Sequence, residues 1–310
     1  MLLNAPAYLC TPTYDGSGQV VHPSIIDFWL EYGLSSWGGY RFWMAITPYP
    51  NGDDAYENPG LLVSQDGINW SFPFGIPNPL DIKLGTCCSE PANYNSDPDL
   101  IFDPFHQCLV LYWRETKVNV FEQIWSIRIN EKRFIGPKIL GLSEPFSAET
   151  LIMSPSVWRK GEAEWFMWTC NGYRIFLYTS NDGLTWGSRT ECSLDFKNKT
   201  MEENLPWHLS VKPNYLKQRL EFFICGSPNQ QKTRLWYAQA SMHDLRNIIA
   251  LLDGYVLVPS QNPLGWDNDM IYRSAFTFEN IGGLHYYHVW YSAQSREGKW
   301  HLGYTEGYME

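Results

Sequence analysis

Five similar segments recur along the chain, and each is followed by a short run rich in aliphatic and aromatic residues. The five segments are VVHPSII (20–26), SDPDLIF (96–102), MSPSVWR (153–159), PWHLSVKP (206–213) and IYRSAFTF (271–278). The runs after them are RFWMAIT, CLVLYWR, EWFMWTC, RLEFFICG and LHYYHVWYS. A repeat of roughly 60 residues built from short strands predicts a radial array of small sheets. We therefore expect five units of similar construction.

A repeated turn supports the same period. SQDGINW (64–70) and SNDGLTW (180–186) share the pattern Ser-x-Asp-Gly-x-x-Trp, and QASMHDLRNI (239–248) is a looser third copy. In such a turn the Asp side chain bonds the backbone just after it, and the Gly accepts a positive φ. Each copy is expected to be the turn between the two outer strands of a unit. Trp70 and Trp186 are then expected to pack between sheets.

Helical periodicity is scarce, and the best candidate, HDLRNIIALLDG (243–254), is long enough only for a local turn. Short antiparallel strands in five units predict an all-β fold, a five-bladed β-propeller of four-stranded antiparallel blades. Residues 1–310 are expected to form this propeller as a single domain.

The charge balance excludes several classes of partner. The net charge is −10 and no Lys/Arg run is present, which argues against binding to nucleic acid or to an anionic membrane. No apolar stretch approaches the roughly 18 residues of a membrane span. The start of the chain lacks the pattern of a signal peptide, so we expect a cytoplasmic protein or a component of a phage particle.

The recurring segments also predict a site. In a propeller the innermost strands begin at one mouth of the central channel, so the first polar residues of the five segments should ring a single funnel. These residues are His22, Asp97 or Asp99, Ser154, His208 and Arg273. The loops between second and third strands return to the same mouth and add Glu57 and Arg114, and Trp207 adjoins it. Carboxylates, imidazoles, guanidinium groups and aromatic faces together suit a ligand with many hydroxyls.

Hydrolysis of a glycosidic bond needs two carboxyl groups that flank it. Asp97 and Glu57 are the leading pair, with His22 expected to share a proton or orient a water. Asp97 would also suit a turn cap, and both histidines would suit a packed core. Further candidate acids are Glu149, Glu90 and Asp269, and the predicted sugar-binding residues are Asp99, Arg114, Ser154, Trp207, His208 and Arg273.

The strand-opening segments, the S-x-D-G-x-x-W turns and the count of five resemble the five-bladed propeller glycosidases of glycoside hydrolase families 43, 62, 32, 68 and 117. TPTYDGSGQVVHPSI, WMAITPYPNGDDAYENPG and PWHLSV look more closely like propellers found in phage tails and in gut or soil bacteria. The family 43 resemblance implies a general base Asp opening the first blade, an Asp opening the second and a general acid Glu opening the third. Asp97 or Asp99 matches the second position, whereas His22 and Met153-Ser154 stand at the other two. The carboxylate set is therefore non-standard.

The sequence predicts a glycoside hydrolase-like protein that acts on a polysaccharide or oligosaccharide at the central funnel. The alternative is a non-catalytic carbohydrate-binding propeller for phage-tail or surface glycan recognition, and a purely structural propeller is the third reading. No cofactor is predicted. Some members of the resembled families hold a cation in the channel, but nothing in this sequence has metal-ligand spacing, so no metal is assigned.

Overall fold

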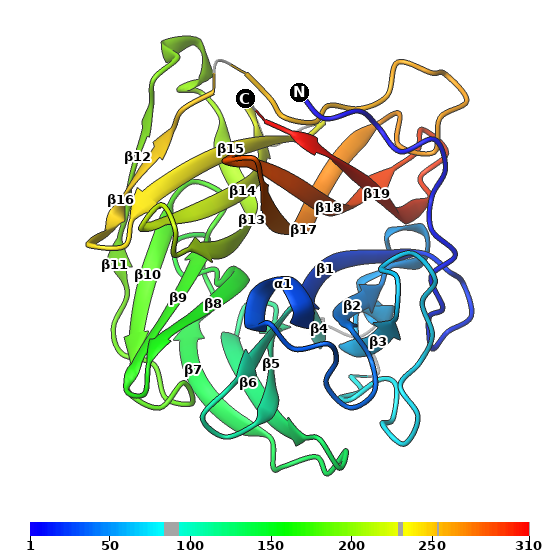
Figure 1. The fold of residues 1–310 in the computed structure, drawn as a ribbon, viewed down its shortest axis with the longest axis vertical. Helices are drawn as coiled ribbons and strands as arrows, with labels where there is room; N and C mark the ends of the chain where they lie inside the picture. Colours follow the sequence, from blue (N-terminus) through cyan, green and yellow to red (C-terminus); the bar gives the residue numbers. More distant parts are fainter. Residues whose placement is uncertain (84–92, 229–231, 253, 310) are drawn as a thin grey trace.

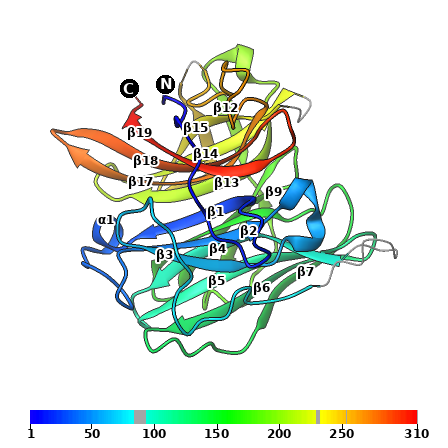
Figure 2. The same cartoon turned by 90° about the vertical axis from the view of Figure 1, so that its right-hand side faces the viewer.

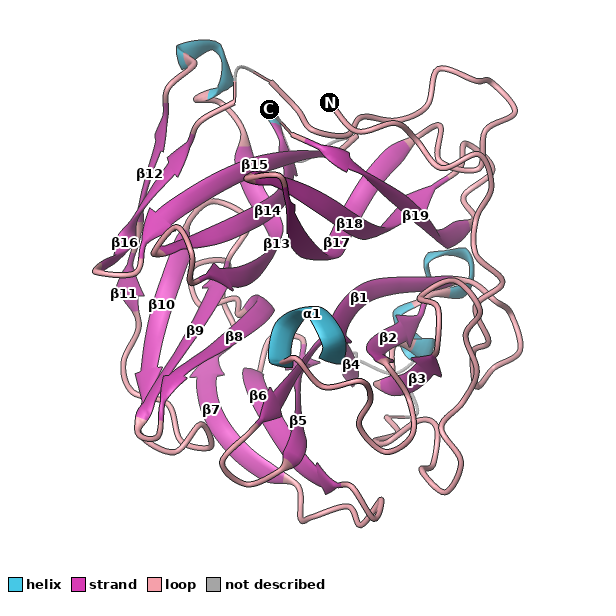
Figure 3. Cartoon of the chain, viewed as in Figure 1, coloured by secondary structure: helices cyan, strands magenta, loops and turns pink. Residues whose placement is uncertain are grey.

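The computed structural model arranges the chain as five sheets around a central channel (Figure 1). It describes residues 1–83, 93–228, 232–252 and 254–309. The predicted all-β, five-bladed propeller is confirmed, and helices contribute only a few short turns (Figure 3). No described helix has the length and apolar character needed to cross a membrane.

The first two blades lie at the right and the bottom of Figure 1. The first blade contains β1 (Val20–Asp27), β2 (Phe42–Pro48) and β3 (Gly60–Ser64). Its connections carry the helix α1 (Phe28–Tyr32) and the 3-10 turns η1 (Pro50–Gly52) and η2 (Asp54–Tyr56). The second blade contains β4 (Asn93–Asp103), β5 (Cys108–Lys117), β6 (Phe121–Asn130) and β7 (Ile139–Pro145).

The remaining three blades complete the ring. The third contains β8 (Met153–Gly161), β9 (Glu164–Cys170), β10 (Ile175–Ser180) and β11 (Thr190–Glu191). The fourth contains β12 (Ser193–Phe196), β13 (Leu205–Asn214), β14 (Arg219–Ser227), β15 (Arg234–Ser241) and β16 (Asp244–Ala250), with η3 (Lys199–Met201) after β12. The fifth contains β17 (Met270–Ile281), β18 (Leu284–Gln294) and β19 (Trp300–Tyr308). The five recurring segments of the sequence are the innermost strands β1, β4, β8, β13 and β17.

The expectation of four antiparallel strands in every blade is only partly right. The second and third blades have four strands, the first and fifth have three, and the fourth has five. In the first blade the outer position is reduced to a single bridge between Val63 and Ser71. The extra strand of the fourth blade is β12, which leaves the third blade and pairs in parallel with β16. The helical candidate at 243–254 is wrong, because most of it forms β16.

The two copies of the Ser-x-Asp-Gly turn have matching hydrogen bonds. The Asp66 carboxylate accepts from the backbone N–H groups of the second and third residues after it, and Asp182 does the same. Gly67 and Gly183 have φ values of 76° and 71°, as the turn requires. Trp70 and Trp186 are buried in clusters shared by neighbouring blades, so the predicted packing of both rings is confirmed.

The hydrophobic core is divided among the blade interfaces. One cluster lies between each pair of neighbouring blades, including one between the first and the fifth. Both faces of each sheet are therefore apolar, which explains the strands that are hydrophobic on both sides. The N-terminal segment lies along the fifth blade, where the backbone N–H of Leu9 donates to the carbonyl of Leu302 at 2.8 Å. The packing of each blade against its two neighbours holds the innermost strands side by side around the channel.

Candidate functional site

A backbone irregularity marks the start of all five innermost strands. The register between the first and second strands shifts near His22, Asp97, Ser154, His208 and Arg273, as a β-bulge does. The first three of these residues have φ values of 56°, 50° and 55°, in the left-handed region that non-glycine residues seldom adopt. A bulge redirects one side chain away from the sheet face. Strain of this kind is concentrated at binding and catalytic sites.

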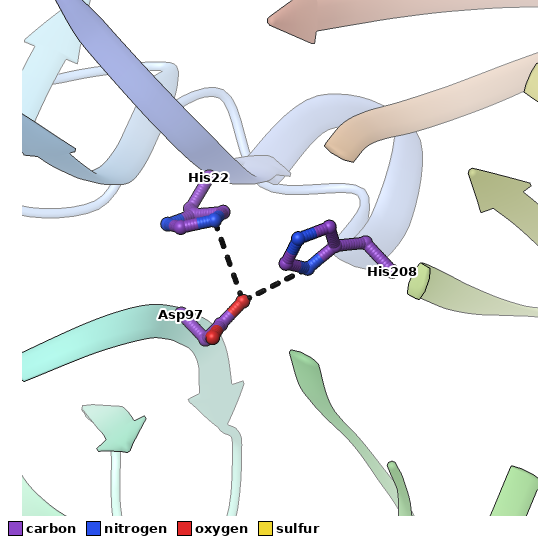
Figure 4. Close-up of side chains that lie close together, drawn as sticks. All are labelled: His22, Asp97 and His208. Carbon is purple, nitrogen blue, oxygen red and sulfur yellow. Dashed lines mark ion pairs between the residues drawn. The ribbon is translucent and has the colours of Figure 1, made fainter. Parts of the chain in front are cut away.

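Three of the redirected side chains meet at one mouth of the channel. His22 from β1, Asp97 from β4 and His208 from β13 converge there, as Figure 4 shows. Oδ1 of Asp97 lies 3.5 Å from Nε2 of His22 and 3.0 Å from Nδ1 of His208. All three side chains are buried. The prediction that strand openers far apart in sequence share one funnel therefore holds for these residues.

Asp97 is held as an anion. Burial alone would raise its pKa, but the charges of His22, His208 and Arg114 hold the pKa of this carboxyl well below its usual range. Burial lowers the pKa of His208, which favours the neutral imidazole. One carboxylate and two imidazoles are a common set of donors for a divalent metal.

The donor atoms are also free of competing bonds. Nε2 of His22, Oδ1 of Asp97 and Nδ1 of His208 are buried and, apart from one another, have no hydrogen-bond partner in the described part of the chain. One donor atom from each residue can be chosen so that all lie within 4.8 Å of one another. Ligands on a tetrahedral ion with bonds of about 2.0 Å stand about 3.3 Å apart, close to the 3.0 and 3.5 Å found here. The three residues therefore fit a metal ion, although their sequence positions had suggested none.

Glu57 stands beside this group. Its Oε1 lies 3.2 Å from Nδ1 of His22, and the same ring nitrogen lies 3.0 Å from the hydroxyl of Thr47. Burial raises the pKa of Glu57 to about 7, against the opposing effect of His22. With Nδ1 engaged by these neighbours, Nε2 of His22 is the nitrogen left to face Asp97. Glu57 is therefore both a support for His22 and a carboxyl that can exchange protons near neutral pH.

Aromatic side chains form one wall of the mouth. The ring of Tyr272 lies 4.3 Å from that of His208, and its hydroxyl accepts a hydrogen bond from Nε1 of Trp207 at 3.1 Å. Trp300 lies 5.1 Å from Tyr272, and Tyr49 lies 5.5 Å from Trp300, measured between ring centres. Such a wall can hold the apolar face of a sugar ring.

The other predicted binding residues lie around or behind the three. Arg114 is buried and clamps Glu122 through two hydrogen bonds, while its NH1 lies 3.5 Å from Oδ2 of Asp97. Ser154 exchanges hydrogen bonds with the backbone of Leu209 on the next blade. Both side chains already form hydrogen bonds within the protein, and these bonds do not test whether they also contact a sugar. The predicted sugar contact of Arg114 and Ser154 therefore stays a prediction.

Asp99 and Arg273 lie one layer deeper in the channel. Asp99 accepts hydrogen bonds from the hydroxyl of Ser24 at 2.8 Å and from the backbone N–H of Val157 at 2.7 Å. Arg273 reaches both acids, with NH2 3.5 Å from Asp99 and NH1 3.9 Å from Asp97. Of the two acids in the segment SDPDLIF, only Asp97 points into the mouth. Asp99 joins three blades.

Two of the remaining candidate acids are not part of this group. Glu149 is exposed, and Asp269 pairs with Lys232 at 3.2 Å. Glu90 lies outside the described residues. Sequence reasoning missed Thr47, Tyr272 and Trp300. Tyr272 directly precedes the strand opener Arg273, as Trp207 precedes His208, so its place beside the funnel was a signal that could have been used.

Similar proteins are found among curated sequences and among solved structures. No protein-family model matches the chain. Among curated proteins it is 25% identical to the A type blood N-acetyl-alpha-D-galactosamine deacetylase of Flavonifractor plautii, over 96% of this chain and 43% of that protein. The chain thus spans less than half the length of this relative.

Two solved structures of other proteins are similar to this chain in fold. The crystal structure of an N-acetylgalactosamine deacetylase from F. plautii, in complex with blood group B trisaccharide, matches with a TM-score of 0.84 and 21% identity over 99% of this chain and 96% of that one. A thermostable family-43 glycoside hydrolase matches with a TM-score of 0.60 and 10% identity over 94% and 90%. The chain has the fold of the glycosidase-like five-bladed propellers. The resemblance read from the strand openers and turns is confirmed at this level.

Proposed function

We propose that the protein is a carbohydrate-active hydrolase that removes the acetyl group from an N-acetylated sugar, with a divalent metal held by His22, Asp97 and His208. The observation that carries this proposal is the convergence of three buried donor atoms that, within the described structure, contact only one another. When bound at such a site, a divalent metal polarises a carbonyl group and lowers the pKa of a water molecule. The related deacetylase supports the choice of an N-acetyl group.

Glu57 is assigned the proton transfers. A water oxygen forms a bond to the acetyl carbon, and one proton of that water passes to the Glu57 carboxylate. The C–N bond then breaks, and the proton moves from Glu57 to the departing nitrogen. The products are acetate and the free amino sugar, so no other reactant is needed. Glu57 is suited to accept and release a proton because burial raises its pKa to about 7.

The same geometry disfavours a glycosidase that uses Asp97 and Glu57 as its two carboxyls. The glycosidic oxygen and the sugar ring must fit between the two groups. Here the imidazole of His22 lies between them, 3.2 Å from Glu57 and 3.5 Å from Asp97. Asp97 is also a poor proton donor, because its neighbours hold its pKa low. The glycosidase reading stays a prediction that the following experiment tests directly.

The test measures two products from the same reaction. The protein is incubated with N-acetylgalactosamine, N-acetylglucosamine and oligosaccharides that end in them, and both acetate and new reducing ends are quantified. We expect acetate without new reducing ends, and loss of acetate release after treatment with a chelator. Asp97→Asn and Glu57→Gln should each lower the rate by at least about 100-fold. Asp195→Asn, at an exposed carboxyl, is the matched control.

Three results would contradict the proposal in different ways. New reducing ends without acetate would favour the glycosidase. Sugar binding without either product, unchanged in Asp97→Asn and Glu57→Gln, would favour the non-catalytic carbohydrate-binding propeller. Acetate release that survives both chelation and Asp97→Asn would leave deacetylation standing but remove the metal from it.

A further inference from the structure

A second hollow lies at the opposite mouth of the channel. It has a volume of about 690 Å³ and is lined by the far ends of all five innermost strands. These strand ends contribute residues 24–26, 99–102, 156–160, 210–216 and 275–280, and residues 29–32, 104–105 and 285 complete the lining. The helix α1 lies over the middle of the ring on this side (Figure 1), whereas the 3-10 turns after β2 lie at the other end (Figure 2). A volume of this size is typical of sites for small ligands.

Arg273 separates this cavity from the mouth that holds Asp97. Its NH1 faces Asp97 at 3.9 Å, while its NH2 lies 3.5 Å from Asp99 and donates to the carbonyl of Pro155 at 3.0 Å. Asp99 lines the cavity, whereas Asp97, His22 and His208 do not. The buried guanidinium group therefore lies between the two mouths. A ligand in the cavity would not touch the proposed catalytic residues.

Aromatic rings surround the entrance. Trp29 is 57% exposed and Tyr215 is 56% exposed, although both line the cavity. The hydroxyl of Tyr215 accepts a hydrogen bond from Nε1 of Trp158 at 3.1 Å, which fixes the orientation of its ring. Exposed rings held over a cavity provide flat apolar faces at small entropic cost. A ligand with at least one flat apolar face fits this entrance.

Two residues of the inner wall carry buried hydroxyl groups. Ser210 and Thr277 line the cavity, and their hydroxyl oxygens are buried and without hydrogen-bond partners in the described part of the chain. These residues are only 8% and 2% exposed. A buried hydroxyl without a partner is unfavourable by about 1–3 kcal/mol, so a ligand that bonds to it is favoured. The ligand therefore needs hydrogen-bonding groups at its inner end.

The charges of the wall are already balanced. The charged lining residues Glu31, Asp99, Arg159, Lys160 and Lys212 each have an ionic partner within the described structure, and Glu279 lies 3.2 Å from Nε2 of His288. Lys212, for example, donates to Glu31 at 2.7 Å and to the carbonyl of Ile25 at 2.8 Å. An ionic ligand would have to break one of these pairs. The charge pattern selects a neutral molecule.

We propose that this cavity binds a short neutral saccharide, separately from the proposed catalytic mouth. A neutral sugar combines an apolar ring face for Trp29 and Tyr215 with hydroxyls for Ser210 and Thr277. A purely apolar ligand would leave the inner hydroxyls unpaired, and a charged ligand would disturb the ion pairs. The cavity thus gives the protein a second point of attachment to a glycan.

The test measures binding of galactose, lactose, maltotriose and N-acetylgalactosamine by calorimetry and by saturation-transfer NMR. We expect at least one of these sugars to bind to the Asp97→Asn variant as tightly as to the wild type. Trp29→Ala should weaken that binding by about tenfold, and the isosteric Thr277→Val should weaken it by several-fold. Phe134→Ala, at a ring that is 69% exposed and outside the cavity, is the control.

Acetate release separates this proposal from the proposed function. Trp29→Ala and Thr277→Val should retain acetate release from N-acetylgalactosamine, because both residues are remote from the catalytic mouth. The saccharide site would be refuted if none of the four sugars binds, or if their binding is unchanged in both variants. It would also be refuted if the neutral apolar dye Nile red occupies the cavity and the sugars do not displace it. Loss of all sugar binding in Asp97→Asn alone would assign that binding to the catalytic mouth.

Discussion

Metal binding should stabilise the folded propeller, because the three ligands come from three different blades. His22, Asp97 and His208 lie on the innermost strands of the first, second and fourth blades. An ion that all three hold is bound by the closed ring and not by the unfolded chain. Binding therefore adds to the free energy of unfolding by mass action.

The size of the effect follows from the length of the chain. At a free metal concentration about 100 times the dissociation constant, the gain is about 2.7 kcal/mol. Unfolding entropy is about 2.1 cal/mol/K per residue, which for 310 residues gives about 0.65 kcal/mol/K. The ratio of these two quantities is a rise of about 4 °C in Tm. We expect this shift when zinc is returned to protein that a chelator has stripped.

The measurement is differential scanning fluorimetry or calorimetry across a zinc titration. Asp97→Asn should abolish the shift, since an amide does not replace a carboxylate ligand. Asn also tolerates the left-handed backbone at this position, where φ is 50°, so the variant should fold. Asp195→Asn should behave like the wild type. An unchanged Tm in the wild type, or an equal shift in Asp97→Asn, would refute the reasoning.

Three further predictions follow from the packing and the site. Asp99→Asn should lower the free energy of unfolding by about 3 kcal/mol, measured by urea titration, because this carboxylate accepts hydrogen bonds from two other blades; an effect below about 1 kcal/mol would contradict its structural role. Gly183→Ala should cost about 3 kcal/mol in the same assay, since the new Cβ would stand 2.6 Å from the Trp165 ring at a φ of +71°. Gly282→Ala has a similar φ but open space around it, and should cost about 1 kcal/mol; equal losses would mean that the contact with the ring is relieved. Trp207→Ala should raise KM for the N-acetylated sugar by about tenfold and leave kcat within about threefold; a fall in kcat alone would show that the ring does not bind the ground-state sugar.

The sequence repeats predicted the architecture because each repeated turn is stabilised by residues close together in the chain. The Ser-x-Asp-Gly turn carries its own hydrogen bonds, and the two copies are nearly the same in structure. The number of strands per blade was less predictable. Whether β12 stays with the third blade or pairs with β16 of the fourth depends on neighbouring sheets and not on its four residues. The segment that forms β16 looked like a weak helix candidate for the same reason, because its pairing as a strand depends on neighbouring strands and not on its own residues.

The candidate site was predictable as a location but not as a chemistry. The positions of His22, Asp97 and His208 at strand openers placed them at one mouth. Metal sites are usually read from ligands at short sequence spacing, and these three come together only through ring closure and the bulges that turn them inward. Asp97 and Asp99 were also hard to separate, because both are buried at the channel. Only the bulge at Asp97 decides which of them faces the mouth.

The most direct test of the account is the position of a bound metal. Crystals soaked with zinc would be measured at wavelengths above and below the zinc absorption edge, and the anomalous difference map would be calculated. We predict one strong peak within bonding distance, about 2.0–2.2 Å, of a ring nitrogen of His22, a carboxylate oxygen of Asp97 and a ring nitrogen of His208. A map with no peak among these three residues, in crystals where zinc binds elsewhere on the surface, would contradict it.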